Sequence, residues 1–170
     1  RLLRVGVLGC GPIAQAAHFE SCTKARNAEL YAICDVADDL RERMAITHGA
    51  EKTFNDYDKM LADPDVDAVI IATSDAFHVP ASIRALEAGK HVLCEKPLAY
   101  SGEDAQAMVD ACREARVHLM TAYRLHFEEG NLDAIKAVRS GKIGEARLFT
   151  SVHTMQVDPG NIRTDLSLGG

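Results

Sequence analysis

The stretch of sequence that decides the fold is Val5-Gly6-Val7-Leu8-Gly9-Cys10-Gly11-Pro12-Ile13-Ala14. It is an apolar, strand-like run that leads into a Gly-x-Gly-x-x-Ala turn and then into a helical pattern. Gly9 permits the tight turn, Gly11 lets the backbone approach a pyrophosphate because it has no Cβ, and Ala14 allows close packing of helix on strand. The first helical residues, Pro12 and Ile13, lie where free N–H groups and the positive end of the helix dipole would face the phosphates. The stretch therefore predicts dinucleotide binding.

A second apolar run, over residues 30–34, ends in Asp35. This spacing is typical of an acidic residue that binds the adenosine ribose 2′-OH of NAD. Asp35 would repel the 2′-phosphate of NADP, and Val36 and Ala37 supply no nearby arginine to offset the repulsion, so we expect NAD to be preferred. Two alternatives stay open here: a tight turn with an unrelated surface acid, and an adenosyl-methionine methyltransferase, which shares much of the pattern.

The composition describes a soluble globular protein, with 47% apolar and 26% charged residues among 170. This length fits one domain with a proper core, or one domain and part of another. The net charge of −6 is spread along the chain without a Lys/Arg cluster, so we expect no nucleic-acid partner. The longest apolar runs, such as residues 68–73, are too short to cross a bilayer, and we expect no membrane span.

The five cysteines include no Cys-x-x-Cys, and three of them lie in strand-like apolar runs. They are interpreted as buried thiols of a reducing compartment, which predicts a cytoplasmic protein. The seven histidines are scattered without the spacing of metal ligands, so no metal site is expected. A removed presequence stays open, because the chain begins at Arg1.

Strand-like and helix-like segments alternate along most of the chain. The strand-like runs lie at about 3–8, 30–34, 52–54, 67–73, 91–94 and 117–122, and the helix-like segments at about 12–25, 37–48, 55–62, 76–88, 101–115 and 128–140. Asn55 and Ser101 are the expected N-caps, and Gly49, Gly89 and Gly141 the expected C-terminal caps. The alternation predicts an α/β fold, a Rossmann doubly wound parallel sheet with helices on both faces.

The pattern changes after Gly144. Residues 145–153 alternate with period two, as in an antiparallel strand with one wet face, and a loop-like segment follows. We expect a Rossmann domain over 1–123, a connecting helix over 124–144, and the first strand and loop of an incomplete α+β substrate domain over 145–170. Since one strand cannot bury its face alone, the chain is expected to be truncated.

Polar segments follow three of the predicted strands, at the carboxyl edge of the sheet where ligands bind in open parallel sheets. Each has a structural alternative: a helix cap, a solvent-facing histidine or a loop ion pair. The segments are Thr73-Ser74-Asp75-Ala76-Phe77-His78, Glu95-Lys96-Pro97 and Tyr123-Arg124.

Together with the glycine turn, these segments resemble one family, that of glucose-fructose oxidoreductase, inositol dehydrogenase and the rhizopine-catabolism proteins. The resemblance spans essentially the whole chain, and Glu95-Lys96-Pro97 in the fifth-strand position is its most specific mark. Thr73-x-x-x-x-His78 and Gly144 ahead of a new strand are further marks. Residues 123–127 and 160–163 are most similar to the glucose-fructose oxidoreductase branch.

The resemblance implies hydride transfer between a nicotinamide cofactor and a hydroxyl-bearing carbon of a sugar or polyol. Lys96 would be the catalytic residue, which orients the substrate hydroxyl and helps its proton leave. A free lysine has a pKa of ~10.4, so this role requires burial or a neighbouring cation to lower it. Glu95 would lie by the nicotinamide ribose and Arg124 over the nicotinamide end. The cofactor cleft would be lined by Thr73, Ser74, Asp75 and His78.

The resemblance also concerns the substrate side. The family's further catalytic His or Tyr lies in an Asp-x-Gly-x-His/Tyr segment that this sequence does not reach, so we expect the chain to bind cofactor better than it turns over substrate. His126 and Arg163 are candidate substrate contacts, and the substrate domain is expected to form a homo-oligomer. The histidines interpreted as structural are His18, His91, His118 and His153. A non-catalytic, dinucleotide-sensing regulator of the same fold is the alternative function, against which the intact Lys96 counts.

Overall fold

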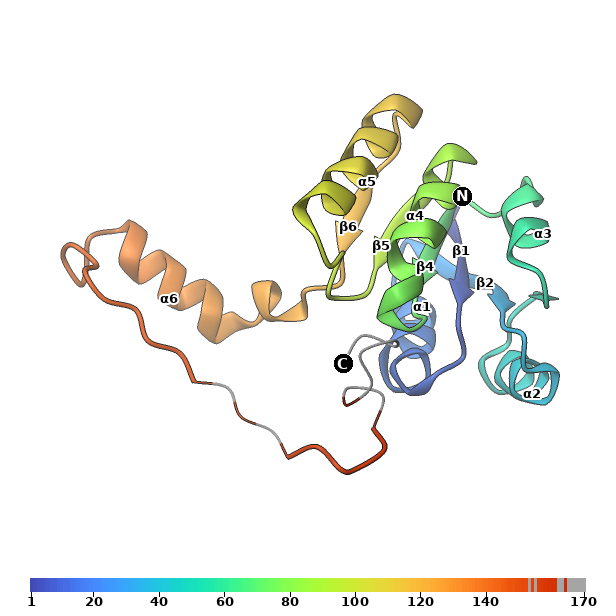
Figure 1. The fold of residues 1–170 in the computed structure, drawn as a ribbon, viewed down its shortest axis with the longest axis horizontal. Coiled ribbons are helices and arrows are strands. Elements are labelled where there is room, and N and C mark those ends of the chain that lie inside the picture. The colour runs from blue at the N-terminus through green and yellow to red at the C-terminus, as the bar shows by residue number, and fades with distance from the viewer. Residues whose placement is uncertain (153, 155, 162–163, 165–170) are drawn as a thin grey trace. The chain divides into compact units, whose positions relative to one another are not determined.

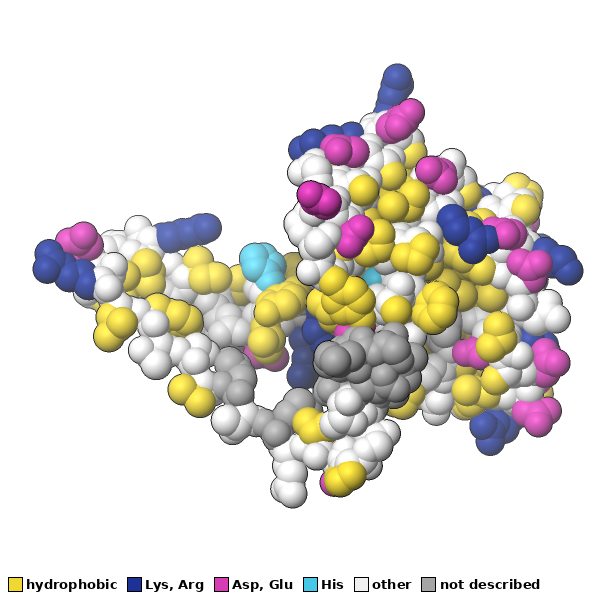
Figure 2. Space-filling view, in the orientation of Figure 1, with side chains coloured by type: hydrophobic (Ala, Val, Ile, Leu, Met, Phe, Trp, Pro, Cys, Tyr) yellow, Lys and Arg dark blue, Asp and Glu magenta, His cyan; other side chains and the backbone are white. Residues whose placement is uncertain are grey.

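The computed structural model describes residues 1–152, 154, 156–161 and 164. The chain forms two compact units, an N-terminal unit, Arg1–Ala122, and a C-terminal unit, Tyr123–Gly170 (Figure 1). No helix in the described part of the chain is both long and apolar enough to span a membrane. On the face shown in Figure 2, acidic and basic side chains are interspersed, without a continuous patch of one sign.

A six-stranded parallel sheet forms the centre of the N-terminal unit, in the order β3-β2-β1-β4-β5-β6. This order confirms the predicted doubly wound Rossmann fold, in which the chain adds strands outward in both directions from the β1–β4 pair. The strands are β1 (Leu3–Leu8), β2 (Ala28–Cys34), β3 (Lys52–Phe54), β4 (Ala68–Ile71), β5 (His91–Cys94) and β6 (Leu119–Thr121).

Helices cover both faces of the sheet and bury a separate apolar cluster on each. One cluster contains residues of α3, α4 and α5, and the other contains residues of α1 and α2. The helices of this unit are a π-helical turn η1 (Ala14–His18), α1 (Phe19–Lys24), α2 (Asp38–His48), α3 (Tyr57–Ala62), a 3-10 turn η2 (Asp75–Phe77), α4 (His78–Glu87) and α5 (Gly102–Ala115).

Strand β1 contacts both apolar clusters, because alternate residues face opposite sides of the sheet. Val5 and Val7 are buried in the cluster under α1 and α2. The residue between them points to the opposite face, since successive side chains of a strand alternate. There a Cβ on Gly6 would lie 2.9 Å from the Sδ of Met60 in α3, so any side chain at this position would require the Met60 side chain to shift.

The helix caps agree with the predictions except at one position. The Ser101 hydroxyl accepts a hydrogen bond from the Asp104 N–H at 3.0 Å, as predicted, and Gly49 ends α2 with a φ of +71°. The cap of α3 is Asp56, whose carboxylate accepts from the Asp58 N–H, and not Asn55. Asp56 is itself a favourable cap residue and lies next to the first helical residue.

All five cysteines are free thiols, and Cys10, Cys22, Cys34 and Cys94 are buried, as predicted. Burial raises the pKa of Cys22 and of Cys94 to about 11. Burial and the nearby Asp35 carboxylate raise the pKa of Cys10 and of Cys34 to about 12. Cys22 lies in the cluster under α1 and α2, and Cys94 lies in the cluster under α3, α4 and α5.

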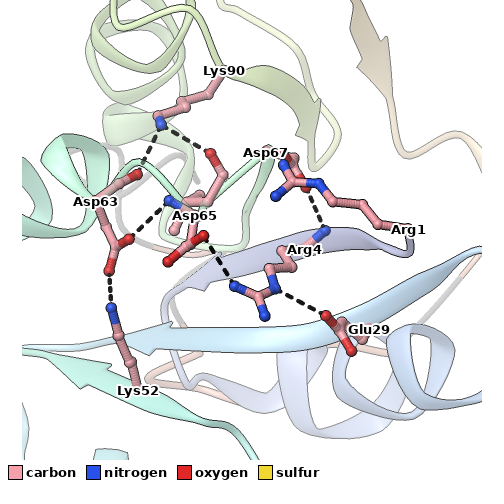
Figure 3. A network of polar contacts seen from close by, with 9 residues as sticks. Arg1, Arg4, Glu29, Lys52, Asp63, Asp65, Asp67 and Lys90 are labelled. Carbon is pink, nitrogen blue, oxygen red and sulfur yellow. Dashed lines mark hydrogen bonds and ion pairs between the residues drawn. The ribbon is translucent and has the colours of Figure 1, made fainter.

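A polar network holds the connection between α3 and β4 (Figure 3). The carboxylate of Asp63 accepts from Lys52 Nζ at 2.7 Å and from the Asp65 N–H at 2.9 Å. Lys90 Nζ donates to the carbonyl oxygens of Asp63 and Val66 at 2.9 and 2.8 Å. Burial raises the pKa of the Asp63 carboxyl, but the hydrogen bonds from Lys52 and Asp65 outweigh this, and the pKa lies below its usual value. Figure 3 also shows Arg1, Arg4, Glu29 and Asp67 in this network.

The C-terminal unit contains a 3-10 turn, η3 (Arg124–Phe127), and one helix, α6 (Glu129–Arg139). The strand predicted over 145–153 is not formed: the described part, 145–152, has no strand structure and is exposed. The alternating pattern alone does not produce a strand, because its backbone groups need a neighbouring strand and no described strand pairs with it.

Candidate functional site

The glycine turn follows β1 at the point where the strand order reverses, because β2 lies on one side of β1 and β4 on the other. Gly9 fixes the geometry of this turn. Gly9 has a φ of +98°, and a Cβ there would lie 2.7 Å from the carbonyl oxygen of Ala72 at the end of β4. Its N–H donates to the Cys34 carbonyl of β2 at 2.8 Å. Only glycine permits this approach of the turn to both neighbouring strands.

Gly11 and the start of the first helix present an open surface. A Cβ on Gly11 would meet no atom within 4 Å, so space is left for a ligand to approach the backbone. Ile13 is 41% exposed and Pro12 is exposed, whereas Ala14 is buried against the sheet. The helix start has no side-chain cap, so its N–H groups are available to an anion. These residues fit the pyrophosphate of a dinucleotide.

Asp35 is held at the end of β2 by the backbone around it. Its Oδ2 accepts from the Cys10 N–H at 2.7 Å, and its Oδ1 accepts from the Ala37 N–H at 2.8 Å. Each carboxylate oxygen has two acceptor positions, so capacity for a ribose diol remains. The carboxylate is thus fixed directly beside the glycine turn.

Val36 and Ala37 supply no arginine near Asp35, as expected, but an arginine farther along the chain does reach this residue. Arg41 of α2 folds back and donates from Nη1 to the Asp35 carbonyl oxygen at 3.0 Å. The same guanidinium forms ion pairs with Asp38 at 2.6 Å and with Glu42 at 3.2 Å. The contact forms because the first turn of α2 brings Arg41 back toward Asp35. Nothing in the sequence between the two residues indicates it.

The polar residues after β4 are partly exposed at the same sheet edge. Ser74 precedes η2 but its side chain makes no capping hydrogen bond. The Thr73 hydroxyl donates only a long bond, 3.3 Å, to the Ser74 carbonyl oxygen. Asp75 lies in η2, with Oδ1 4.0 Å from the ring of His78. The helix-cap alternative for Thr73 and Ser74 therefore does not account for these side chains.

Lys96 follows β5 at this edge of the sheet. Both carboxylate oxygens of the preceding residue, Glu95, make polar contacts. Glu95 is 8% exposed. Its Oε1 lies 2.9 Å from His18 Nε2, and its Oε2 accepts from the Lys96 N–H at 3.1 Å. The Lys96 side chain itself is exposed, and within the described residues its ammonium has no ion-pair partner. An exposed amine is thus displayed on an anchored backbone.

His78 is 1% exposed, so it is not a solvent-facing residue. Its Nδ1 lies 2.7 Å from the Pro97 carbonyl oxygen, and its Nε2 lies 3.2 Å from the Thr73 carbonyl oxygen. The ring therefore joins the segment after β4 to the segment after β5.

Sequence reasoning missed the part that His18 takes in this site. The sequence predicts a structural role for His18, and its buried ring contacts the Glu95 carboxylate next to Lys96. Ala14 and His18 are buried one helical turn apart, on the face that packs on the sheet. A histidine on a buried face requires a polar partner, and that signal could have pointed to it.

Arg124 and His126 lie in η3 of the C-terminal unit, where both are exposed and the His126 ring packs edge-on against Phe127. Arg163, the other candidate substrate contact, lies outside the described residues. Among the described residues, no cluster of His, Cys, Asp and Glu could hold a metal ion.

The glycine turn, the open helix start and Asp35 at the edge of a doubly wound sheet define a dinucleotide-binding Rossmann domain. Residues 3–123 match the oxidoreductase family with an NAD-binding Rossmann fold, the Gfo/Idh/MocA family. The chain belongs to this family, and the expected membership is confirmed.

Known members resemble the chain in sequence and in structure. Myo-inositol 2-dehydrogenase of Thermotoga maritima is 36% identical over 86% of this chain and 44% of its own length. Scyllo-inositol dehydrogenase of Lactobacillus casei, solved with NAD(H) and scyllo-inositol, has a TM-score of 0.80 at 28% identity and covers 85% of this chain and 43% of its own. A 3-ketoreductase of Actinomadura kijaniata, solved with NADP and TDP-benzene, has a TM-score of 0.79 at 31% identity, with 85% and 44% covered. The chain spans about half the length of the curated relatives it matches.

Proposed function

We propose that the protein is a nicotinamide-dependent oxidoreductase that transfers a hydride between NAD and a hydroxyl-bearing carbon of a sugar or polyol. The observation that carries the proposal is Lys96, an exposed amine on an anchored backbone at the sheet edge that also bears the glycine turn. The relatives named for inositol dehydrogenation support the substrate class.

The residues of this chain divide the work of such a reaction. The backbone at Gly11 and the first helical turn bind the pyrophosphate, and Asp35 binds the adenosine ribose. Glu95, Thr73, Ser74 and Asp75 border the nicotinamide half of the crevice. The bound cofactor supplies the hydride acceptor. In the direction of oxidation, Lys96 as the neutral amine would accept a hydrogen bond from the substrate hydroxyl, orient it and take up its proton as the hydride leaves the carbon.

The proposal is tested by replacing Lys96 in the intact protein. We expect Lys96→Met to lower kcat on a polyol panel by on the order of 10²-fold, with little change in the Kd for NAD, because acid–base assistance is lost and cofactor binding is not. Lys59→Met, on the exposed side of α3, is the matched control and should leave both constants unchanged. Wild-type turnover by Lys96→Met would show that Lys96 is a bystander, and NAD binding without turnover of any polyol would favour the dinucleotide-sensing regulator.

We further propose that NAD is preferred over NADP. Both carboxylate oxygens of Asp35 are held by backbone N–H groups beside the glycine turn, and at a ribose they would accept from a diol and repel a phosphate. Arg41 does not offset this repulsion, because Asp38 and Glu42 neutralise its charge. Calorimetry should give a lower Kd for NAD than for NADP.

The double variant Asp35→Ser, Val36→Arg should relax the preference, and Asp39→Ser, on the exposed first turn of α2, should not. Equal affinity of the unmodified protein for both cofactors would refute the preference.

We also propose a homo-oligomer formed through the C-terminal part of the intact protein, and a cytoplasmic location. The free thiols support a reducing compartment. Light scattering of the intact protein and of the chain ending at Ala122 tests the assembly: only the former should exceed the monomer mass.

A further inference from the structure

Two buried histidines contact the backbone segment that carries Lys96, one on each side of it. His18 contacts Glu95, the residue before Lys96, through a ring-to-carboxylate bond of 2.9 Å. His78 contacts Pro97, the residue after Lys96, through a bond of 2.7 Å to its carbonyl oxygen. The two rings are 6% and 1% exposed. They are therefore parts of the interior, and each is directed at one residue of the Lys96 segment.

The two histidines belong to different elements of the fold. His18 ends the π-helical turn that follows the glycine turn. His78 begins α4, directly after the segment that follows β4, and its second nitrogen contacts the Thr73 carbonyl oxygen of that segment at 3.2 Å. Thus the cofactor-facing helix and the β4 segment both hold the backbone of Lys96.

Hydrogen-bond chemistry assigns the direction of each contact. His18 Nε2 donates to the carboxylate of Glu95, whose other oxygen accepts from the Lys96 N–H. The carboxylate therefore links the imidazole directly to the lysine backbone. Both partners of His78 are carbonyl oxygens, which only accept, and a neutral imidazole donates from one nitrogen. We assign the donor to Nδ1, because its contact with the Pro97 carbonyl oxygen is the shorter of the two.

We propose that His18 and His78 are positioning residues for Lys96, an inference that rests on the proposed function. The lysine side chain is exposed and unpaired in the described part of the chain, so the described contacts act on its backbone, which sets where the side chain starts. Displacement of a catalytic group by ~1 Å costs ~10²-fold in rate. Holding the backbone from two directions limits that displacement without using any group that touches substrate.

Asn and Gln variants give a specific test, because each places its side-chain NH₂ near one of the two imidazole nitrogens. Gln places its NH₂ near the position of Nε2, and Asn places it near Nδ1. His18→Gln keeps the bond to Glu95, and His18→Leu removes it. His78→Asn keeps the bond to Pro97, and His78→Gln loses it because its NH₂ lies beside the Thr73 carbonyl oxygen instead. His48→Leu is the matched control, since that ring packs on Phe19 of α1 at 4.8 Å and does not contact the Lys96 segment.

The first measurement is kinetic and uses the intact protein with NAD and a polyol panel. His18→Leu and His78→Gln should lower kcat by roughly 10-fold to 100-fold, with a Kd for NAD within about 2-fold of wild type. His18→Gln, His78→Asn and His48→Leu should keep most of kcat. Equal losses in the paired amide variants at His78 would overturn the proposal, since a merely structural role does not distinguish Nδ1 from Nε2.

The second measurement needs no turnover. Amide hydrogen exchange of Lys96, followed by NMR in protein labelled with ¹⁵N-lysine, should be faster in His18→Leu and His78→Gln and unchanged in the other three variants. Unchanged exchange in those two, or faster exchange with unchanged kcat, refutes the positioning role. If no polyol is turned over, the proposed function fails, and the exchange measurement alone decides whether the histidines hold the lysine.

Discussion

Gly9 and Gly11 lie two positions apart in one turn but are glycine for different reasons. At Gly9 the backbone has a positive φ and touches the end of β4, so a side chain has no room in the folded protein itself. At Gly11 there is free space around the Cβ position, so a side chain would obstruct only a molecule that approaches from outside. Gly9 is thus required by the fold, and we propose that Gly11 serves binding.

Alanine at each position should separate the two roles. We expect Gly9→Ala to lower the free energy of unfolding by about 1–3 kcal/mol, the usual cost of a strained backbone conformation, or more because of the overlap with Ala72. Gly11→Ala should stay within about 0.5 kcal/mol of wild type but weaken NAD binding. Urea unfolding and calorimetry measure these quantities. Equal loss of stability in both variants would contradict the assignment.

Sequence could place the glycine turn, Asp35 and the Lys96 segment at one sheet edge, because a parallel topology brings all strand ends of one kind together. It could not supply the contacts of His18 or Arg41. The partner of His18 lies 77 positions away, and that pairing depends on how the first helix packs on the sheet. The partner of Arg41 is a backbone carbonyl, which carries no signal in the sequence.

At the scale of elements, Asp63 ties β3 to the connection that leads into β4. Its carboxylate accepts a hydrogen bond from Lys52, the first residue of β3. Its carbonyl oxygen accepts one from Lys90, just before β5 (Figure 3). Its pKa in the folded protein is lowered, so the unfolded state binds more protons and stability rises with pH across this titration. The stabilisation is complete above the unfolded value near 3.8 and is lost as the pH falls through the lower, folded value.

The variant Asp63→Asn should be less stable than wild type at pH 7, and the difference should shrink below about pH 4, where wild type also loses the charge. Urea unfolding at several pH values gives both free energies. Glu87→Gln, on the exposed end of α4, is the matched control and should follow wild type throughout. A difference that stays constant with pH would show that the carboxylate charge is not the cause.

Most elements of the N-terminal unit could be predicted closely because they bury apolar residues that their own pattern marks, as β4 does along its whole length. Residues 145–152 show the opposite case. Their alternation is as regular as that of a strand, yet a strand is completed by another strand, and the described residues provide none. Pattern therefore specifies which residues can pair, and the presence of a partner decides whether they do.

At the scale of the molecule, the two units should differ in protection from amide exchange. We expect strong protection in β1, β4 and β5 of the 170-residue chain, and almost none over 145–152, whose backbone is exposed. Mass spectrometry of exchanged peptides measures this. Strong protection over 146–152 in a monomer of this chain would contradict the need for a further partner segment.

The alkylation rates of the buried thiols report how often the structure around them opens. Alkylation requires the thiolate, and both burial and the raised pKa suppress it in Cys22 and Cys94, so a reagent at neutral pH modifies them only when the surrounding structure opens. Because the two cysteines lie under opposite faces of the sheet, their separate labelling rates time the opening of the α1–α2 face and of the α3–α5 face in one experiment. Cys112, partly exposed on α5, should react first, and its rate is the reference for a thiol that needs little or no opening.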